Sequence, residues 1–229
     1  MIYGIDVSHW QGTIDWQKVA TTGVKFAFIK ATEGSKYHDV KYIANFEGAR
    51  SAGILTGAYH FLSHNVNAAE QALYFLQVVR QAQEIAGCKH PLPLVLDCEE
   101  PGRSSVLRPL ILDFLAVIEK AGFITPIIYT SPGYWRGYIG RHDEFLRYPL
   151  WVANYRAPYP QQFYPWLKWS FWQYSEKGAI PGIAGSSVDL DLFNGSLTDL
   201  LKLAISSHEK IPNPTYRVRG KHIRPEEIK

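Results

Sequence analysis

The sequence lacks any long run of apolar residues and has only two cysteines among its 229 residues. No stretch approaches the roughly 18 to 20 consecutive apolar residues that a membrane-spanning helix needs, so we expect no stable membrane insertion. The amino terminus also lacks the basic segment followed by an apolar one that marks an export signal. Cys88 and Cys98 are too few for a disulfide framework, and we expect two buried thiols.

An excess of one sign of charge is also missing, because the net charge is only +3. Residues 208–229 nevertheless hold six Lys or Arg against three Glu. We expect residues 1–207 to form a single domain and residues 208–229 a basic tail rather than a separate domain. The tail suits either contact with an anionic polymer or simple solvation as a chain end. Without helix-turn-helix or zinc-ligand spacing, we expect no nucleic-acid partner.

A helical stretch that closes on a glycine and is followed by a short β run recurs along the chain. The glycines are Gly23, Gly53 and Gly122, and the clearest helical periodicity covers residues 66–86 and 106–121. Glycine just past a helix end adopts the left-handed conformation that other residues resist, which indicates helix-to-strand junctions. Alternating strands and helices predict a mainly parallel sheet.

Strand-like runs are predicted at eight places, which is the number that closes a parallel barrel. They are residues 2–6, 26–30, 56–61, 94–99, 126–129, 150–153, 170–174 and 188–193. The last three lie close together with little helical sequence between them. The sequence therefore predicts an irregular α/β barrel.

Asp97 and Glu99 end the apolar run that begins at Leu94. Residues two apart on a strand point to the same face, and two buried carboxylates on one face raise each other's pKa. One can then donate a proton while the other stays charged, which is the division of labour that glycoside hydrolysis requires. The alternative is a strand end that emerges into solvent with two ordinary surface acids.

Polar or charged residues also end the other predicted strands, as in barrel enzymes whose catalytic groups come from the carboxyl ends of several strands. They are Asp6, Lys30 with Glu33, His60, Tyr129, Asn154 with Tyr155, Gln173 with Tyr174, and Asp189. Each has a structural alternative when taken alone: Asp6 as a turn cap, Lys30 as an ion-pair partner of Glu33, and His60 as a hydrogen-bonded structural histidine. Together they indicate a site at one end of the barrel.

Tyr and Trp supply 21 residues, and flat rings with polar edges suit the apolar faces and hydroxyl groups of sugars. Most of these rings are expected in the core. The rings beside strand ends are Trp10, Tyr59, Tyr129, Tyr134, Trp135, Trp151, Tyr155, Trp172 and Tyr174. We expect Tyr129 and Trp151 to be the best candidates for a sugar platform.

Seven motifs, in order between about Ile2 and Leu203, resemble those of the glycoside hydrolase family 25 lysozymes, the Chalaropsis-type muramidases. They are GIDVSHWQG (4–12), FIKATEG (28–34), GAYHF (57–61), DCE (97–99), WVANY (151–155), FWQY (171–174) and VDLD (188–191). The resemblance implies an irregular TIM-like barrel of eight strands with about five main helices. It also implies hydrolysis of the β-1,4 bond between N-acetylmuramic acid and N-acetylglucosamine in peptidoglycan.

By matching position, the resemblance makes Glu99 the general acid and Asp97 its partner, with Asp6 and Asp189 completing an acidic pocket. We expect Glu99 to be held protonated by these three aspartates. Asp97 would stay ionised and orient the 2-acetamido group as that group attacks the anomeric carbon, although direct attack by an aspartate stays open. The residues expected to contact substrate are Lys30, Glu33, Tyr59, His60, Tyr129, Trp151, Asn154, Tyr155, Gln173 and Tyr174. We expect a monomer that acts on glycan strands without metal or cofactor.

Two other functions are compatible with the Asp-x-Glu strand end. One is a chitinase-like hydrolase, although Val95 and Leu92 stand where such enzymes usually carry two further acids. The other is a non-catalytic sugar-binding barrel, although such proteins typically lose the acid that Glu99 supplies. The missing export signal suggests an endolysin made in a host cytoplasm and then released to the bacterial cell wall.

Overall fold

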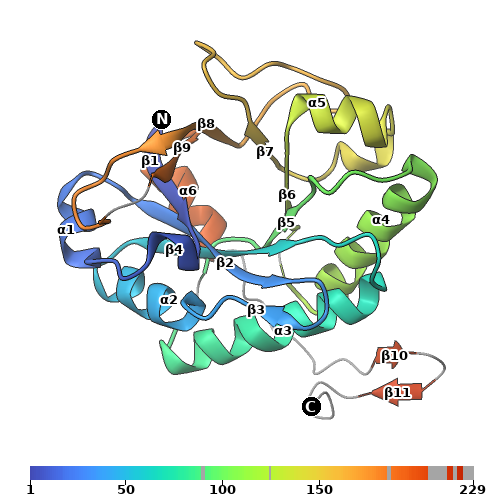
Figure 1. Ribbon diagram of the computed structural model, residues 1–229, viewed down its shortest axis with the longest axis horizontal. Helices are drawn as coiled ribbons and strands as arrows, with labels where there is room; N and C mark the ends of the chain where they lie inside the picture. Colours follow the sequence, from blue (N-terminus) through green and yellow to red (C-terminus); the bar gives the residue numbers. More distant parts are fainter. Residues whose placement is uncertain (89–90, 124, 185–186, 206–215, 219–220, 224–229) are drawn as a thin grey trace.

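The computed structural model describes residues 1–88, 91–123, 125–184, 187–205, 216–218 and 221–223. Within these residues one sheet contains nine strands: β1 (Ile2–Val7), β2 (Phe26–Glu33), β3 (Tyr37–His38), β4 (Leu55–Phe61), β5 (Val95–Asp97), β6 (Ile127–Thr130), β7 (Leu150–Ala153), β8 (Phe171–Gly178) and β9 (Val188–Phe193). Their order is β1-β9-β8-β7-β6-β5-β4-β2-β3, and β1 also pairs with β2. Eight strands therefore close a barrel, which confirms the predicted strands, and β3 extends the sheet beside β2 (Figure 1).

The barrel strands run parallel except for β9. It pairs antiparallel with β1 on one side and with β8 on the other. The first residues of β9 therefore lie at the same end of the barrel as the last residues of the other strands. This end holds the candidate site.

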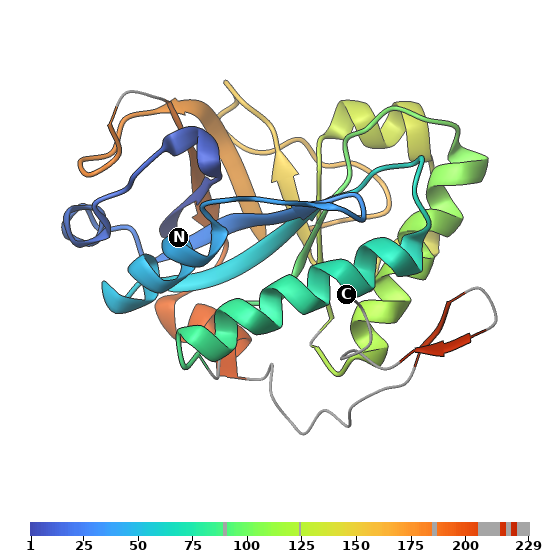
Figure 2. The ribbon, with the colours of Figure 1, turned by 60° about the horizontal axis from the view of Figure 1, so that its bottom comes forward.

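Helices lie on the outside of the barrel. The described residues include five helices of six or more residues, in agreement with the expected number: α1 (Trp16–Thr21), α2 (Tyr42–Ser51), α3 (Ala68–Ile85), α4 (Ser104–Lys120) and α6 (Leu197–Ile205). Shorter helical turns are η1 (His9–Gln11), α5 (Pro132–Tyr134), η2 (Trp135–Ile139) and η3 (Asp143–Phe145). Helices α1 to α4 follow one another around the left, lower and right sides of Figure 1, and Figure 2 shows α3 running beside the strands. No helix joins β7, β8 and β9 in the described residues, so the barrel is irregular as predicted.

The helix-to-strand junctions form as the sequence predicts. Gly23, Gly53 and Gly122 have positive φ angles of 93°, 78° and 82°. The side chain of Asn67 accepts hydrogen bonds from the backbone N–H groups of Ala69 and Glu70, which fixes the start of α3. These local signals set where each helix ends and the next strand begins.

Aromatic rings fill the interior of the barrel below the site. The Phe28 ring lies 4.6 Å from Trp151 and 5.1 Å from Phe171, and Phe26 lies 5.3 Å from Phe171. Gly57 in β4 makes room for this packing, because a Cβ there would lie 2.5 Å from the Phe28 ring. The barrel is thus a packed core and not a channel, and the floor of any pocket at its open end is apolar.

A second core lies between barrel and helices and includes both cysteines as buried thiols, as predicted. No helix in the described residues is long and apolar enough to cross a membrane. Of the predicted tail, β10 (Tyr216–Val218) and β11 (Lys221–Ile223) form an antiparallel pair. The remainder of the tail lies outside the described residues.

Candidate active site

Four carboxylates converge at the open end of the barrel. A cavity of about 100 Å³ is lined by Asp6, Tyr59, Asp97, Glu99, Tyr129, Trp151, Gln173 and Asp189. Strand alternation explains which residues line the cavity, because interior positions alternate with positions that face the helices. On β5 and its extension, Asp97 and Glu99 line the cavity together, as predicted, while Cys98 packs in the outer core.

Asp189 reaches this cavity by a different route from the one predicted. The sequence analysis placed it at the carboxyl end of its strand, but it is the second residue of β9. Because β9 runs antiparallel to its neighbours, the start of the strand lies over the site. Asp189 faces Asp6 in the register of β1 and β9.

Burial dominates the electrostatics of Asp97 and Glu99. It raises the pKa of Asp97 well above its usual range, and the charge of Glu99 raises it further while Lys30 lowers it. Burial also raises the pKa of Glu99; Lys30 opposes this and Asp189 adds to it. The expected direction for Glu99 is confirmed, but its main cause is burial and not the surrounding aspartates.

Burial and the neighbouring charge of Glu99 act against the ionised form of Asp97 that the sequence predicts. Its side chain is only 6% exposed, and its Oδ1 atom has no hydrogen-bond partner among the described residues. Among the described residues, Lys30 favours the charged form of Asp97. A hydrogen-bond donor on a bound molecule would favour the charged form further.

Gln173 connects one wall of the cavity to Asp6. Its Nε2 donates to Asp6 Oδ2 at 2.7 Å, and its Oε1 accepts from the hydroxyl groups of Tyr129 at 2.8 Å and Tyr155 at 2.6 Å. Tyr155 is half-buried and joins the site through this contact. The Gln173 side chain thus orients two tyrosine hydroxyls and one carboxylate together.

Asp191 is a buried acid that the sequence analysis did not select. It is fully buried, and its Oδ1 accepts a hydrogen bond from Trp151 Nε1 at 2.9 Å. Burial raises its pKa well above the usual range, and Asp189 adds to this shift. Asp191 also contributes to the raised pKa of Asp6. Its position two residues after Asp189 could have identified it, because the two share one face of β9.

Tyr129 and Trp151 form the wall and the floor of the cavity. Their exposed fractions are only 8% and 2%, and their rings meet edge to face with centroids 4.6 Å apart. Trp10 on η1 is instead 76% exposed and lines an adjoining cavity of about 220 Å³. An open aromatic surface therefore lies at Trp10, which the sequence analysis noted but did not assign to the site.

Lys30 lines the adjoining cavity together with Asp97 and Glu99. Its Nζ lies 2.7 Å from Glu33 Oε2, so the ion pair considered as the structural alternative forms. Glu33 lines neither cavity, and it reaches the site only through Lys30. Lys30 is the cation beside the two central carboxylates.

His60 and Tyr174 do not reach the cavity, because they follow interior residues on their strands and so face outward. His60 lies beneath α3 and α4: its Nδ1 is 2.7 Å from Thr32 Oγ1, its Nε2 is 3.2 Å from Gln71 Oε1, and its ring stacks on Phe114. Burial lowers the pKa of His60 to about 3. His60 is therefore a neutral structural histidine and not a substrate contact.

Tyr174 packs at the outer core beside Trp172, with ring centroids 5.7 Å apart. Asn154 also lies outside both cavities, and its Oδ1 accepts from the backbone N–H of Gln161 at 2.7 Å. These two residues shape the surroundings of the site. They are not brought to its lining as the sequence analysis expected.

The arrangement is suited to proton transfer at a sugar. A partly buried carboxyl group with a raised pKa lies beside a second carboxylate, and the cavity has aromatic walls and hydrogen-bonding edges. Among the described residues, no group of three or more His, Cys, Asp and Glu side chains is arranged to hold a metal ion.

The model of the family described as "Glycosyl hydrolases family 25" matches residues 5–183. "Uncharacterized protein YegX" of Escherichia coli (strain K12) is 41% identical over 206 residues, which cover 87% of this chain and 72% of that protein. "Lysozyme M1" of Streptomyces globisporus is 37% identical over 213 residues, which cover 89% of this chain and 71% of that protein.

A solved structure of a bacterial lysozyme from Streptomyces coelicolor is similar to this chain with a TM-score of 0.78. The sequence identity is 35%, and the match covers 89% of this chain and 96% of the other. The similarity in sequence and the similarity in fold therefore extend over the same barrel.

Proposed function

The chain belongs to glycosyl hydrolases family 25 and hydrolyses peptidoglycan as an N-acetylmuramidase, and from this premise we propose that Glu99 is its general acid. The bond cleaved is the β-1,4 bond between N-acetylmuramic acid and N-acetylglucosamine. The observation that carries the proposal is the pairing of Glu99, whose pKa burial raises, with Asp97, which has an unpartnered buried oxygen. Glu99 would protonate the departing glycosidic oxygen.

Asp97 would orient the substrate's own nucleophile. Its Oδ1 has no hydrogen-bond partner in the described part of the chain, and the N–H of a 2-acetamido group is a donor of suitable chemistry. That hydrogen bond would favour the charged form of Asp97 and turn the acetamido oxygen towards the anomeric carbon. The oxygen would form the new bond to this carbon as the bond to the leaving oxygen breaks, the substrate-assisted route of some glycosidases.

Substrate binding would thus favour a charged Asp97 beside a protonated Glu99. The sugar would supply a donor to Asp97 and displace water from Glu99, which raises the pKa of Glu99 further. Asp189 would add negative potential beside the positive charge that develops at the anomeric carbon. Burial raises the pKa of Asp189 to about 6, which still favours the ionised form at neutral pH.

The assignment of the acid is tested by Glu99→Gln. General acid catalysis contributes about a hundred- to ten-thousandfold, so turnover on purified cell walls should fall by at least about two decades while wall fragments still bind. Glu100→Gln is the matched control, because Glu100 is the next residue, lies outside both cavities and contacts His64. Near-normal turnover in Glu99→Gln would contradict the assignment.

The route is tested by proton NMR of the first-formed product. Both the substrate-assisted route and direct attack by an aspartate retain the anomeric configuration. A first product with inverted configuration would exclude both the substrate-assisted route and direct attack.

Clearing of cell walls but not of colloidal chitin would separate the muramidase from a chitinase-like activity. Production in a host cytoplasm, followed by release to the wall, stays a prediction.

A further inference from the structure

The cavity beside the central carboxylates has an outer rim formed by Trp10. This cavity of about 220 Å³ includes Asp97 and Glu99, and it extends from them towards η1. Trp10 lies in η1 directly after β1 and is 76% exposed. A single exposed aromatic residue is ordinary on a protein surface, so its exposure alone indicates no ligand. The way in which Trp10 is held provides the second observation.

The backbone around Trp10 is fixed by a reciprocal cap. Ser8 Oγ accepts a hydrogen bond from the Trp10 backbone N–H at 3.3 Å, and Gln11 Oε1 accepts from the Ser8 backbone N–H at 2.9 Å. Gln11 Nε2 in turn donates to the carbonyl oxygen of Ser187, just before β9. The turn that carries the exposed indole is therefore tied to the far end of the barrel sequence.

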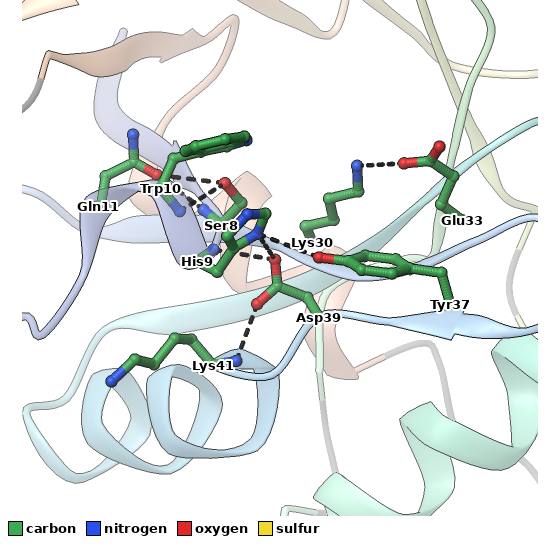
Figure 3. A network of polar contacts seen from close by, with 9 residues as sticks. All are labelled: Ser8, His9, Trp10, Gln11, Lys30, Glu33, Tyr37, Asp39 and Lys41. Carbon is green, nitrogen blue, oxygen red and sulfur yellow. Dashed lines mark hydrogen bonds and ion pairs between the residues drawn. The ribbon is translucent and has the colours of Figure 1, made fainter.

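The indole of Trp10 lies against His9, and Asp39 holds His9 in place (Figure 3). The His9 ring lies against Trp10, with centroids 4.5 Å apart and an angle of 35° between the rings. The backbone N–H and the Nδ1 of His9 both contact Asp39 Oδ2, at 2.9 Å and 2.8 Å. Asp39 is buried, and its Oδ1 accepts from the backbone N–H of Lys41 at 2.9 Å. The platform thus rests on a buried, fully engaged carboxylate.

We propose that Trp10 is a sugar-stacking platform at the outer end of the cleft and that His9 and Asp39 are its positioning residues. The ligand is a β-1,4-linked N-acetylhexosamine unit next to the two sugars of the cleaved bond, which places its apolar face on the indole. The inference rests on the proposed function, since it assigns one more contact to the same glycan strand. It also gives the cleft an open aromatic surface, whereas Tyr129 and Trp151 are buried in its wall and floor.

The test compares Trp10→Ala and Trp10→Phe with Tyr3→Ala. Tyr3 is the matched control, because it is an aromatic residue 60% exposed near the start of β1, at the opposite end of that strand. The probe is the stem-free tetrasaccharide of alternating N-acetylglucosamine and N-acetylmuramic acid. Its binding is measured by calorimetry with every variant placed in an Asp97→Asn, Glu99→Gln background, so that the probe is not cleaved. An aromatic contact of this kind is worth about three- to tenfold in affinity.

Trp10→Ala should raise Kd for the tetrasaccharide and KM on glycan strands by about three- to tenfold, with kcat changed less than twofold. Trp10→Phe should retain most of the affinity, and Tyr3→Ala all of it. Unchanged Kd in Trp10→Ala, or an equal loss in Tyr3→Ala, would overturn the proposal. Because the calorimetric readout needs no turnover, it tests the platform even if Glu99→Gln contradicts the assigned mechanism.

The positioning role is tested by a double-mutant cycle between His9 and Trp10. His9→Ala should raise KM in the presence of Trp10, because the indole loses its support. In the Trp10→Ala background, His9→Ala should leave KM unchanged. Equal effects of His9→Ala in both backgrounds would show that His9 acts independently of Trp10 and would overturn its positioning role.

Discussion

Replacing Asp189 with Asn should make the protein more stable and less active. The pKa of Asp189 rises from the usual 3.8 to about 6 on folding, mainly because the group is buried. A raised pKa means that folding stabilises the protonated form, so the associated stability is present below about pH 4 and is lost as the pH rises through about 6. At neutral pH the wild-type protein carries this ionised group at a cost that Asn, being neutral, does not incur.

The size of the effect follows from the shift. A shift of roughly two pKa units corresponds to about 3 kcal/mol, and solvent screening of this partly exposed group reduces it to about 1–2 kcal/mol. For a chain of this length, that free energy corresponds to an increase of about 3–6 °C in the midpoint of thermal unfolding. The increase should be full above about pH 7 and should vanish near pH 4.

Circular dichroism melts of the wild type and Asp189→Asn between pH 4 and pH 8 measure this difference. Asp113→Asn is the matched control, because Asp113 is an exposed aspartate on α4. Equal midpoints at pH 7.5, or a difference that does not change with pH, would refute the reasoning. Wall-clearing activity should fall in Asp189→Asn, which would show that the charge of Asp189 contributes to catalysis although it destabilises the fold.

Two further predictions concern the cavity wall and the tail. Tyr129→Phe should lower turnover about three- to tenfold at nearly unchanged stability, because Gln173 loses one of its two tyrosine donors but keeps Tyr155. Tyr155→Phe is the comparison. Unchanged turnover in Tyr129→Phe would mean that the Tyr129 hydroxyl has no role in catalysis. Truncation after Ser207 should weaken binding to purified walls at low ionic strength, and the difference from the full-length protein should shrink as salt is added. The midpoint of thermal unfolding should not change. Equal binding by the full-length and truncated proteins at low salt would argue against a role for the tail.

Local patterns were sufficient to predict the barrel and its central acids. The alternation around Asp97 and Glu99 and the glycines after helices depend on short-range geometry, which a sequence displays directly. The antiparallel direction of β9 does not leave such a trace, because pairing partners are set by tertiary contacts. Asp189 was therefore placed in the right pocket for the wrong reason.

The same distinction explains the residues that were misplaced or missed. His60 follows Tyr59 on β4, and the sequence alone does not show which of these neighbours faces inward. The Phe28 ring packed over Gly57 is the kind of tertiary contact that decides the question. Trp10 was not assigned to the site because the sequence does not show that its exposed ring lies beside the cavity that holds Asp97 and Glu99.

The pairing of β1 with β9 means that the first and last barrel strands of the chain must meet before the site is complete. The ribosome delivers Asp6 on the first strand early, and Asp189 follows only when the last barrel strand emerges. Until β9 inserts between β1 and β8, both strands keep an open edge and the pocket has no wall on that side. The four carboxylates can therefore line one cavity only after β9 has paired with β1 and β8.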